Sequence, residues 1–410
     1  MKKMRNILSE CTSYVIAFIL VVLIASVLIV VQGANPIEAF GWMIKGAVGS
    51  KSAIASSIRW STPVIIASTA AVIAQKSGIN NLGIEGQLYF GALTTAVCAV
   101  YVQGPALVVM LVSILAGALA GMLYSVIPAI LRLFFNIDEM LTSLMLNYAA
   151  IQFTEFITMQ VMGLDSNTNP DMIATAEMPE GIGLFRFMQP YQADIGFFIG
   201  IALAVLVYLL YRYTRVGYEW KLIGQNPEFA KYGGINHISN YMMIFLLSGA
   251  VAGVCGAMEM LGPHRRFRTK FSSNMGWDGI MVALIARNHP IAAIFVSIIW
   301  GMIKAGSMNM ERMTNVNRAL VTLVQALFVL FITVDFKGLF QKVMKRKGSK
   351  ANVWSVSIPA GHGIRASADD AGPVCCDGWF FRPQSEGALP WPGKLYGFCR
   401  VLCHVWKLYF

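Results

Sequence analysis

Long apolar segments, far apart along the chain and almost free of charge, constrain this sequence more than any other feature. About 20 apolar residues are enough to cross the hydrocarbon core of a bilayer. The clearest segments are Ile16–Val31, Leu107–Leu131, Ile195–Leu210 and Ala319–Val334. Only 13% of the 410 residues are charged, and soluble proteins do not contain this many long uncharged segments. The chain is therefore predicted to be an all-α polytopic membrane protein.

The apolar periodicity and the flanking charges predict about ten transmembrane helices. They lie near residues 11–33, 55–75, 83–102, 106–131, 138–160, 193–212, 241–261, 276–287, 290–306 and 318–335. The third and the eighth are weak as simple spans, because they are short or interrupted by glycine. The first is interpreted as a retained membrane helix, since its apolar core is longer than that of a secretory signal.

The net charge of +11 is explained by where the cations lie. Lysine and arginine accumulate in cytoplasmic loops; they precede the first crossing and fill segment 337–350, which has no acid. Both ends of the membrane domain are expected in the cytoplasm, and no nucleic-acid partner is predicted. Loop 163–194, with five acids and one arginine, suits the outer side. The basic segment 263–270 also falls outside: either the count is off by one there, or these cations face a funnel or a partner.

A Gly-x-acid-Gly pattern marks both weak crossings, as "GIEG" at 83–86 and "GWDG" at 276–279. A charge near the centre of a bilayer costs roughly 2.5–3.5 kcal/mol, so these acids require a reason. The two crossings lie five apart and run in opposite directions. This spacing indicates an inverted five-plus-five repeat with broken helices near the midplane, although chance similarity of four residues is the alternative.

Further polar residues lie on one face of the crossing 138–160. Glu139, Thr142 and Ser143 follow a helical spacing, and Asn147 lies one turn further along. They either line a pathway or bond neighbouring helices together, and Glu139 could instead reach the headgroups. The small residues of "LSGAVAGVCGA" at 247–257 predict close helix packing.

Enzyme chemistry has little support in this sequence. No G-x-x-x-x-G-K-[ST] phosphate loop occurs, so the chain is not expected to split nucleotide itself. The membrane region contains no metal-ligand pairing and no nucleophile–base arrangement. An ion-coupled secondary transporter, with Glu85 and Asp278 binding protons or sodium, is one function that the polar crossings allow.

Several segments resemble the ABC importer permeases of the branched-chain amino acid and simple-sugar type. The resemblance is carried by "INNLGIEGQLYFGA" with "DEMLTSLMLNYAA", by "STPVIIASTAAVIAQKSG", and by "RVGYEWKLIGQNPEFAKYGGIN", in the expected order over residues 10–340. Within that type the chain looks closest to nucleoside-uptake permeases. The resemblance implies a membrane permease subunit without an ATPase site or a cofactor of its own, taking up nucleosides or a similar small polar solute such as a sugar. It also implies three partners in a bacterial cytoplasmic membrane: an ABC ATPase that binds ATP, a second related permease, and an extracytoplasmic substrate-binding lipoprotein.

The resemblance also implies roles for individual residues. Near the translocation path would lie Asn81, Glu85, Gln87 and Asp278, joined by Asn147 from the polar face described above. A few amides and carboxylates suffice to orient a neutral solute that is rich in hydrogen-bonding edges. A cytoplasmic segment that docks on the ATPase would contain Gly217, Gly224, Asn226, Ala230 and Gly233.

The tail departs from this pattern, so the domains are predicted as a permease domain at 1–347 and an atypical tail at 348–410. The tail contains Cys375, Cys376, Cys399, Cys403, His362 and His404. Their spacing matches no two-pair zinc pattern, and no metal is predicted. A shifted reading frame or a mis-joined gene end, with disorder as the expected state, is the simpler interpretation.

Overall fold

The computed structural model describes residues 21–160, 174–179, 181–314 and 322–323, all of them within the unit Met1–Met344. Helix Val21–Val31 comes first. It is followed by α2 (Pro36–Val48), α3 (Lys51–Lys76), α4 (Ile84–Tyr101), α5 (Ala106–Phe135), α6 (Glu139–Gln160), α7 (Gly196–Tyr213), α8 (Arg215–Gln225), α9 (Pro227–Tyr232), α10 (His237–Glu259), η1 (Met260–His264), α11 (Met275–Ile285) and α12 (Pro290–Met313). Within these ranges the only β-structure is two isolated bridges.

Five helices of the described region are long and apolar enough to cross a membrane: α3, α5, α7, α10 with η1, and α12. Helix Val21–Val31 and α2 together make a sixth candidate, bent by 114°. The prediction of a helical, multi-pass membrane protein is confirmed. The repeat of ten crossings stays a prediction, because crossing 318–335, apart from 322–323, and the tail from 348 lie outside the described residues.

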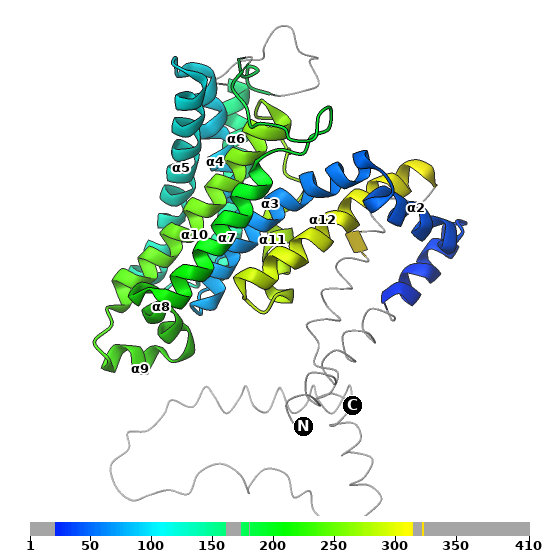
Figure 1. Cartoon of the computed structure of the whole chain (residues 1–410). Coiled ribbons are helices and arrows are strands. Elements are labelled where there is room, and N and C mark those ends of the chain that lie inside the picture. The colour runs from blue at the N-terminus through cyan, green and yellow to red at the C-terminus, as the bar shows by residue number, and fades with distance from the viewer. Residues whose placement is uncertain (1–20, 161–173, 180, 315–321, 324–410) are drawn as a thin grey trace, which may run out of the picture. The chain divides into compact units, whose positions relative to one another are not determined.

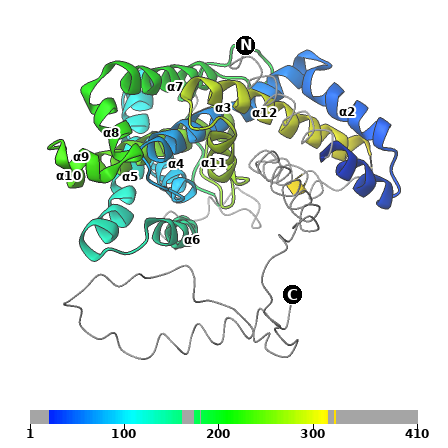
Figure 2. The same ribbon diagram turned by 90° about the horizontal axis from the view of Figure 1, so that it is seen from below.

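Helix α3 forms the centre of the arrangement. In its most apolar window 83% of the residues are buried, and it packs against α7, α10, α11 and α12. Figure 2 shows α3 and α4 between α5 and α6 on one side and α2 and α12 on the other. A helix that is apolar on all faces belongs inside such a bundle.

Helices α5 and α10 approach each other through glycine. A Cβ added to Gly121 would lie 2.8 Å from both N and Cα of Gly253, and Gly249 faces the side chain of Ser125. Larger side chains cannot occupy these positions without separating the helices. The close packing predicted for 247–257 is confirmed.

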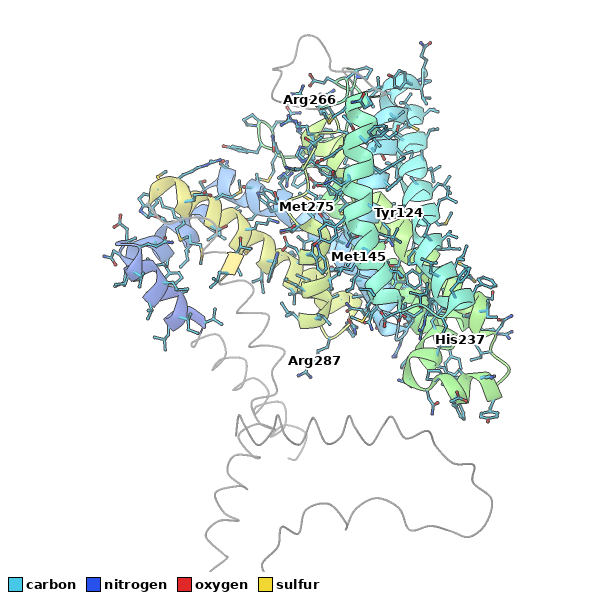
Figure 3. The ribbon with its side chains drawn as sticks, turned by 180° about the vertical axis from the view of Figure 1, so that it is seen from behind. Tyr124, Met145, His237, Arg266, Met275 and Arg287 are labelled. Carbon is cyan, nitrogen blue, oxygen red and sulfur yellow. The ribbon has the colours of Figure 1, made fainter. Side chains whose placement is uncertain are left out.

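The two ends of α10 carry different loops. Helices α8 and α9 lie at its beginning, and the segment 263–270 follows its end (Figure 1). Figure 3 shows His237 and Arg266 at opposite ends of the bundle, with Met275 between them. The segment 263–270 bonds to the loop that was predicted to be external: Thr175 N–H donates to Phe267 O at 2.9 Å. The basic and acidic segments therefore share one end of the molecule.

Candidate functional site

A buried polar cluster lies where α3 gives way to α4. The Asn81 and Gln87 side chains exchange two hydrogen bonds, at 3.1 and 3.2 Å, and Asn81 Nδ2 also donates to Ser248 Oγ at 2.9 Å. Asn81 Oδ1 accepts the N–H of Gly83 at 3.0 Å. The amides thus satisfy backbone and side-chain groups of a non-helical connection, as buried polar groups require.

Asn147 joins α6 to the start of α4. Its Nδ2 donates to Leu82 O at 2.7 Å, and its Oδ1 accepts the N–H of Gly86 at 2.8 Å. Gly86 N–H is one of the donors in the first turn of α4 that have no partner within the helix. Asn147 therefore bonds α6 to the start of α4.

Glu85 connects the starts of two short helices. Its side chain is 4% exposed, with Oε1 accepting from Ser272 Oγ at 2.6 Å and Oε2 accepting from Gly276 N–H at 2.6 Å. Glu85 lies in the first turn of α4 and Gly276 in the first turn of α11. Helix N-termini carry partial positive charge, so both favour a carboxylate here.

The approach of α11 to α4 depends on Gly276. A Cβ at this position would lie 2.7 Å from Glu85 N, so any other residue would push the two helix starts apart. This explains why glycine flanks the acid in the pattern at 276–279. Asn81 bonds to Gln87 and Ser248 rather than to Glu85.

Asp278 forms a buried ion pair with a residue that the sequence analysis did not identify. Lys304 Nζ on α12 lies 2.6 Å from Asp278 Oδ2 and also donates to Ser273 O at 3.1 Å. Lysine within a predicted crossing was an available signal, because cations inside a membrane are expensive and usually paired. Glu85 and Asp278 occupy the same position in the two Gly-x-acid-Gly patterns, but their partners differ. Glu85 accepts from a hydroxyl and a backbone N–H, whereas Asp278 pairs with an ammonium group.

A second ion cluster was also missed. Arg59 Nη2 on α3 lies 2.9 Å from Glu259 Oε2, and His264 Nε2 lies 3.4 Å from the same oxygen. Glu259 and His264 are five residues apart and meet because η1 is a π-helix, a form frequent at functional sites. Arg59 Nη1 is buried and has no hydrogen-bond partner within the part of the chain that the structure describes.

The indole of Trp60 lies between the two ion clusters. The Arg59 guanidinium lies 4.2 Å from its ring centroid and Lys304 Nζ lies 4.9 Å from it. Aromatic rings attract cations through their negative faces. Buried charges on α3, α10, α11 and α12 are therefore linked through one side chain. The described residues contain no cluster of metal-ligating side chains.

The five residues predicted to dock on an ATPase lie in α8, in α9 or at the two ends of α9, and they make contacts inside the chain. Asn226 Oδ1 accepts the N–H of Phe229 at 3.0 Å and caps α9, whose last residue precedes Gly233. Ala230 is 2% exposed, and a Cβ on Gly217 would meet the backbone of Tyr211 at 2.6 Å.

Gly224 on α8 touches the backbone that follows α3. A Cβ at Gly224 would lie 2.7 Å from Ser77 C, and Gly78 adopts a positive φ of 74° at this contact. Substituting a large residue at Gly224 would thus disturb the permease itself. The exposed large apolar side chains of α8 and α9 are aromatic: Tyr218, Phe229 and Tyr232.

Comparison with known proteins identifies the chain's relatives. Residues 53–333 match the family described as branched-chain amino acid transport system / permease component. The chain belongs to this family.

Three curated relatives cover most of the chain. The glucose ABC transporter permease protein TsgB13 of Haloferax volcanii is 30% identical over 76% of this chain and 84% of its own length. The guanosine ABC transporter permease protein NupP of Bacillus subtilis is 28% identical over 83% and 99%. The nucleoside ABC transporter permease protein NupB of Lactococcus lactis is 25% identical over 82% and 92%. The resemblance seen in the sequence is confirmed: the chain is a membrane-spanning ABC importer permease, a transport component rather than the ATPase subunit.

Proposed function

We propose that this permease passes nucleosides across the membrane. The observation that carries the proposal is the similarity to NupP, which spans 99% of that guanosine permease. The polar cluster around Asn81, Gln87 and Ser248 offers amides and hydroxyls with no net charge, which suits a neutral solute with many hydrogen-bonding edges. The similarity to TsgB13, a glucose permease, makes a sugar the second candidate.

Asn81, Glu85, Gln87, Asn147 and Asp278 are assigned to the region of the translocation path. All five are buried. In the state described here each is bonded within the chain, which supports a role in holding the broken helices beside the path. The solute would be recognised when these helices separate, because intramembrane polar groups of this kind mark transport pathways.

The partners follow from the ABC system and are assigned to opposite ends of the bundle. The end with α8 and α9 would face the cytoplasm and the ATPase, since loop 212–234 carries four cations and two acids. The end with 174–186 and 263–270 would receive a substrate-binding lipoprotein. A second related permease completes the transporter in a bacterial cytoplasmic membrane. ATP would bind the partner ATPase, and this chain would need no cofactor.

Reconstitution tests the proposal. The permease, its partner permease and the ATPase are placed in proteoliposomes with the binding protein outside, and uptake of labelled guanosine and glucose is measured. Guanosine uptake that requires ATP and survives an uncoupler is expected. Uptake that collapses with the uncoupler while ATP stays high would favour the ion-coupled alternative, and selective glucose uptake would favour the sugar.

The domain division is also part of the proposal. Residues 1–347 would form the working permease. The tail from 348 would contribute nothing to transport, because its sequence lacks an apolar helical face.

A further inference from the structure

A pocket of about 420 Å³ lies at the α8–α9 end of the bundle. Five segments converge on it: the residues after α3, the end of α5, the start of α6, the α8–α9 segment, and the start of α10. Its lining includes Ser77, Arg132, Glu139, Pro227, His237 and Tyr241. Its volume falls within the range of small-molecule sites.

Tyr241 supplies the strongest sign that this pocket receives a ligand. The side chain is 5% exposed, and among the described residues its buried hydroxyl finds no hydrogen-bond acceptor. The Arg132 guanidinium can only donate to this hydroxyl, so its O–H is left for an acceptor from elsewhere. Buried polar groups are normally satisfied by protein, water or ligand, so an acceptor from a bound molecule would complete the site.

The charges of the pocket favour a neutral polar ligand. Arg132 Nε pairs with Glu139 Oε2 at 3.2 Å, so the cation is balanced within the lining. The ring of His237 is tilted against Tyr241, with centroids 5.8 Å apart. Together with Ile223 and Leu133 these groups offer rings, aliphatic walls and a few hydrogen-bonding atoms, the combination typical of sites for ring-containing solutes.

The pocket adjoins the α3–α4 connection, the α8–α9 segment, and helices α5 and α6. One wall is Ser77–Ile79, which leads directly to Asn81 and the start of α4. Ile223 on α8 and Pro227 on α9 also line the pocket, together with Arg132 on α5 and Glu139 on α6. A molecule held there would resist movement of the α8–α9 segment and the α3–α4 connection, which touch each other, relative to α5 and α6.

We propose that this pocket binds the transported solute, a neutral molecule of the nucleoside class, from the α8–α9 side and slows further import. The inference rests on the proposed function and adds a regulatory site to it. A solute accumulating at that side would fill the pocket, complete the Tyr241 hydrogen bond, and hold the permease in one conformation. A ligand shifts a conformational equilibrium only when it prefers one state, and contact with α5 and α6 as well as with the α8–α9 segment provides such a preference.

The test uses the complete transporter in proteoliposomes whose α8–α9 side faces the lumen. Unlabelled guanosine is loaded inside at increasing concentration with ATP, and the initial uptake of labelled guanosine delivered by the binding protein is measured. The wild-type rate is expected to fall saturably with luminal guanosine. Tyr241→Phe removes only the hydroxyl and is expected to raise the half-inhibitory concentration about fivefold, the effect of one hydrogen bond.

Two further variants, one a control and one that blocks the pocket, are measured in the same assay. Tyr148→Phe makes the same change at an exposed position on α6 and is expected to match wild type. Ile238→Trp adds bulk at an exposed residue that lines the pocket, and is expected to abolish the inhibition while uptake into empty vesicles continues. Absence of saturable inhibition in wild type, or an unchanged Tyr241→Phe curve, would overturn the inference. Absence of uptake into empty vesicles would instead contradict the proposed nucleoside function.

Discussion

Glu85 Oε2 accepts a hydrogen bond from the N–H of Gly276, at 2.6 Å and across 191 positions of sequence. This bond ties the first turn of α4 to the first turn of α11. A carboxylate at this depth is stable because two helix N-termini and the Ser272 hydroxyl surround it. The same contact predicts how substitutions at Glu85 behave.

Glu85→Gln is expected to assemble almost normally, because the amide oxygen still accepts one hydrogen bond. Glu85→Leu leaves the Ser272 hydroxyl and the Gly276 N–H unsatisfied, at about 1–3 kcal/mol each. Fluorescence-detected size exclusion after heating would show a lower midpoint for Leu than for Gln. If both variants are inactive but equally well assembled, Glu85 acts on the solute or an ion rather than on the helices.

Removing one member of the Asp278–Lys304 pair is expected to be more harmful than removing both. Lys304→Met leaves a buried carboxylate unpaired, at about 3–5 kcal/mol. The double variant Lys304→Met with Asp278→Asn should recover much of this loss. The measurement is the thermal midpoint of the single and double variants in the same detergent. If the double variant melts no higher than the single one, the lysine has another essential contact, such as Ser273 O.

The exposed aromatic residues of α9 are expected to anchor the ATPase. Phe229→Ala and Tyr232→Ala remove side chains that are 59% and 88% exposed, so permease stability should stay unchanged. Loss of an aromatic anchor at an interface costs about 2 kcal/mol or more, roughly a 30-fold weaker affinity. Co-purification of the ATPase would measure this. Tyr148→Ala on α6 serves as the control, and normal co-purification with both α9 variants would place the docking surface elsewhere.

Asp194 predicts a pH dependence at the other end of the bundle. Burial raises the pKa of its carboxyl from 3.8 to about 6. The native state therefore binds this proton more readily than the unfolded state, so its contribution to stability grows as pH falls from about 6 toward 4. Between those limits the change is at most about 3 kcal/mol.

Asp194→Asn should remove this dependence and stabilise the protein at pH 7, since the Asn oxygen can still accept the N–H of Gly196, as Asp194 does at 2.9 Å. Thermal midpoints of wild type and variant between pH 4.5 and 8 should converge as pH falls. Glu177→Gln, at an exposed position in the same loop, should leave the profile unchanged. Curves that stay parallel across this range would show that Asp194 is not protonated in the native state.

Deleting residues 351–410 should leave expression and uptake unchanged, or improve them by removing the Trp, Phe and Cys residues of the tail. Uptake assays of the full and shortened chains provide the measurement. Loss of uptake, or zinc bound stoichiometrically to the full chain, would show that the tail is a working domain.

The positions of most helices could be predicted because apolar length and flanking charge are local properties. The two Gly-x-acid-Gly segments correctly marked the starts of α4 and α11. Their partners could not be predicted, because Ser272 and Lys304 come from other segments and nothing local links them to an acid. Likewise the π-helix that brings His264 to Glu259 depends on tertiary packing.

Helix α2 was not predicted, because its residues 36–48 lie between the crossings predicted near 11–33 and 55–75. The 114° bend before it follows Gly33 at positive φ and the Asn35 cap with Pro36 at the helix start. These turn signals were present in the sequence. In α8, Gly217 and Gly224, which were predicted to dock on an ATPase, have backbone atoms of the same chain as their immediate partners.

The contact between Gly224 and Gly78 has a mechanical consequence. Side chains usually act as compliant spacers between helices, because they change rotamer when one helix shifts. At this contact the two main chains touch directly, with no side chain between them that could change rotamer. A displacement of α8 must therefore move the α3–α4 connection with it. A displacement of α8 caused by a partner protein would therefore be transmitted almost rigidly to the amide of Asn81, three residues beyond Gly78.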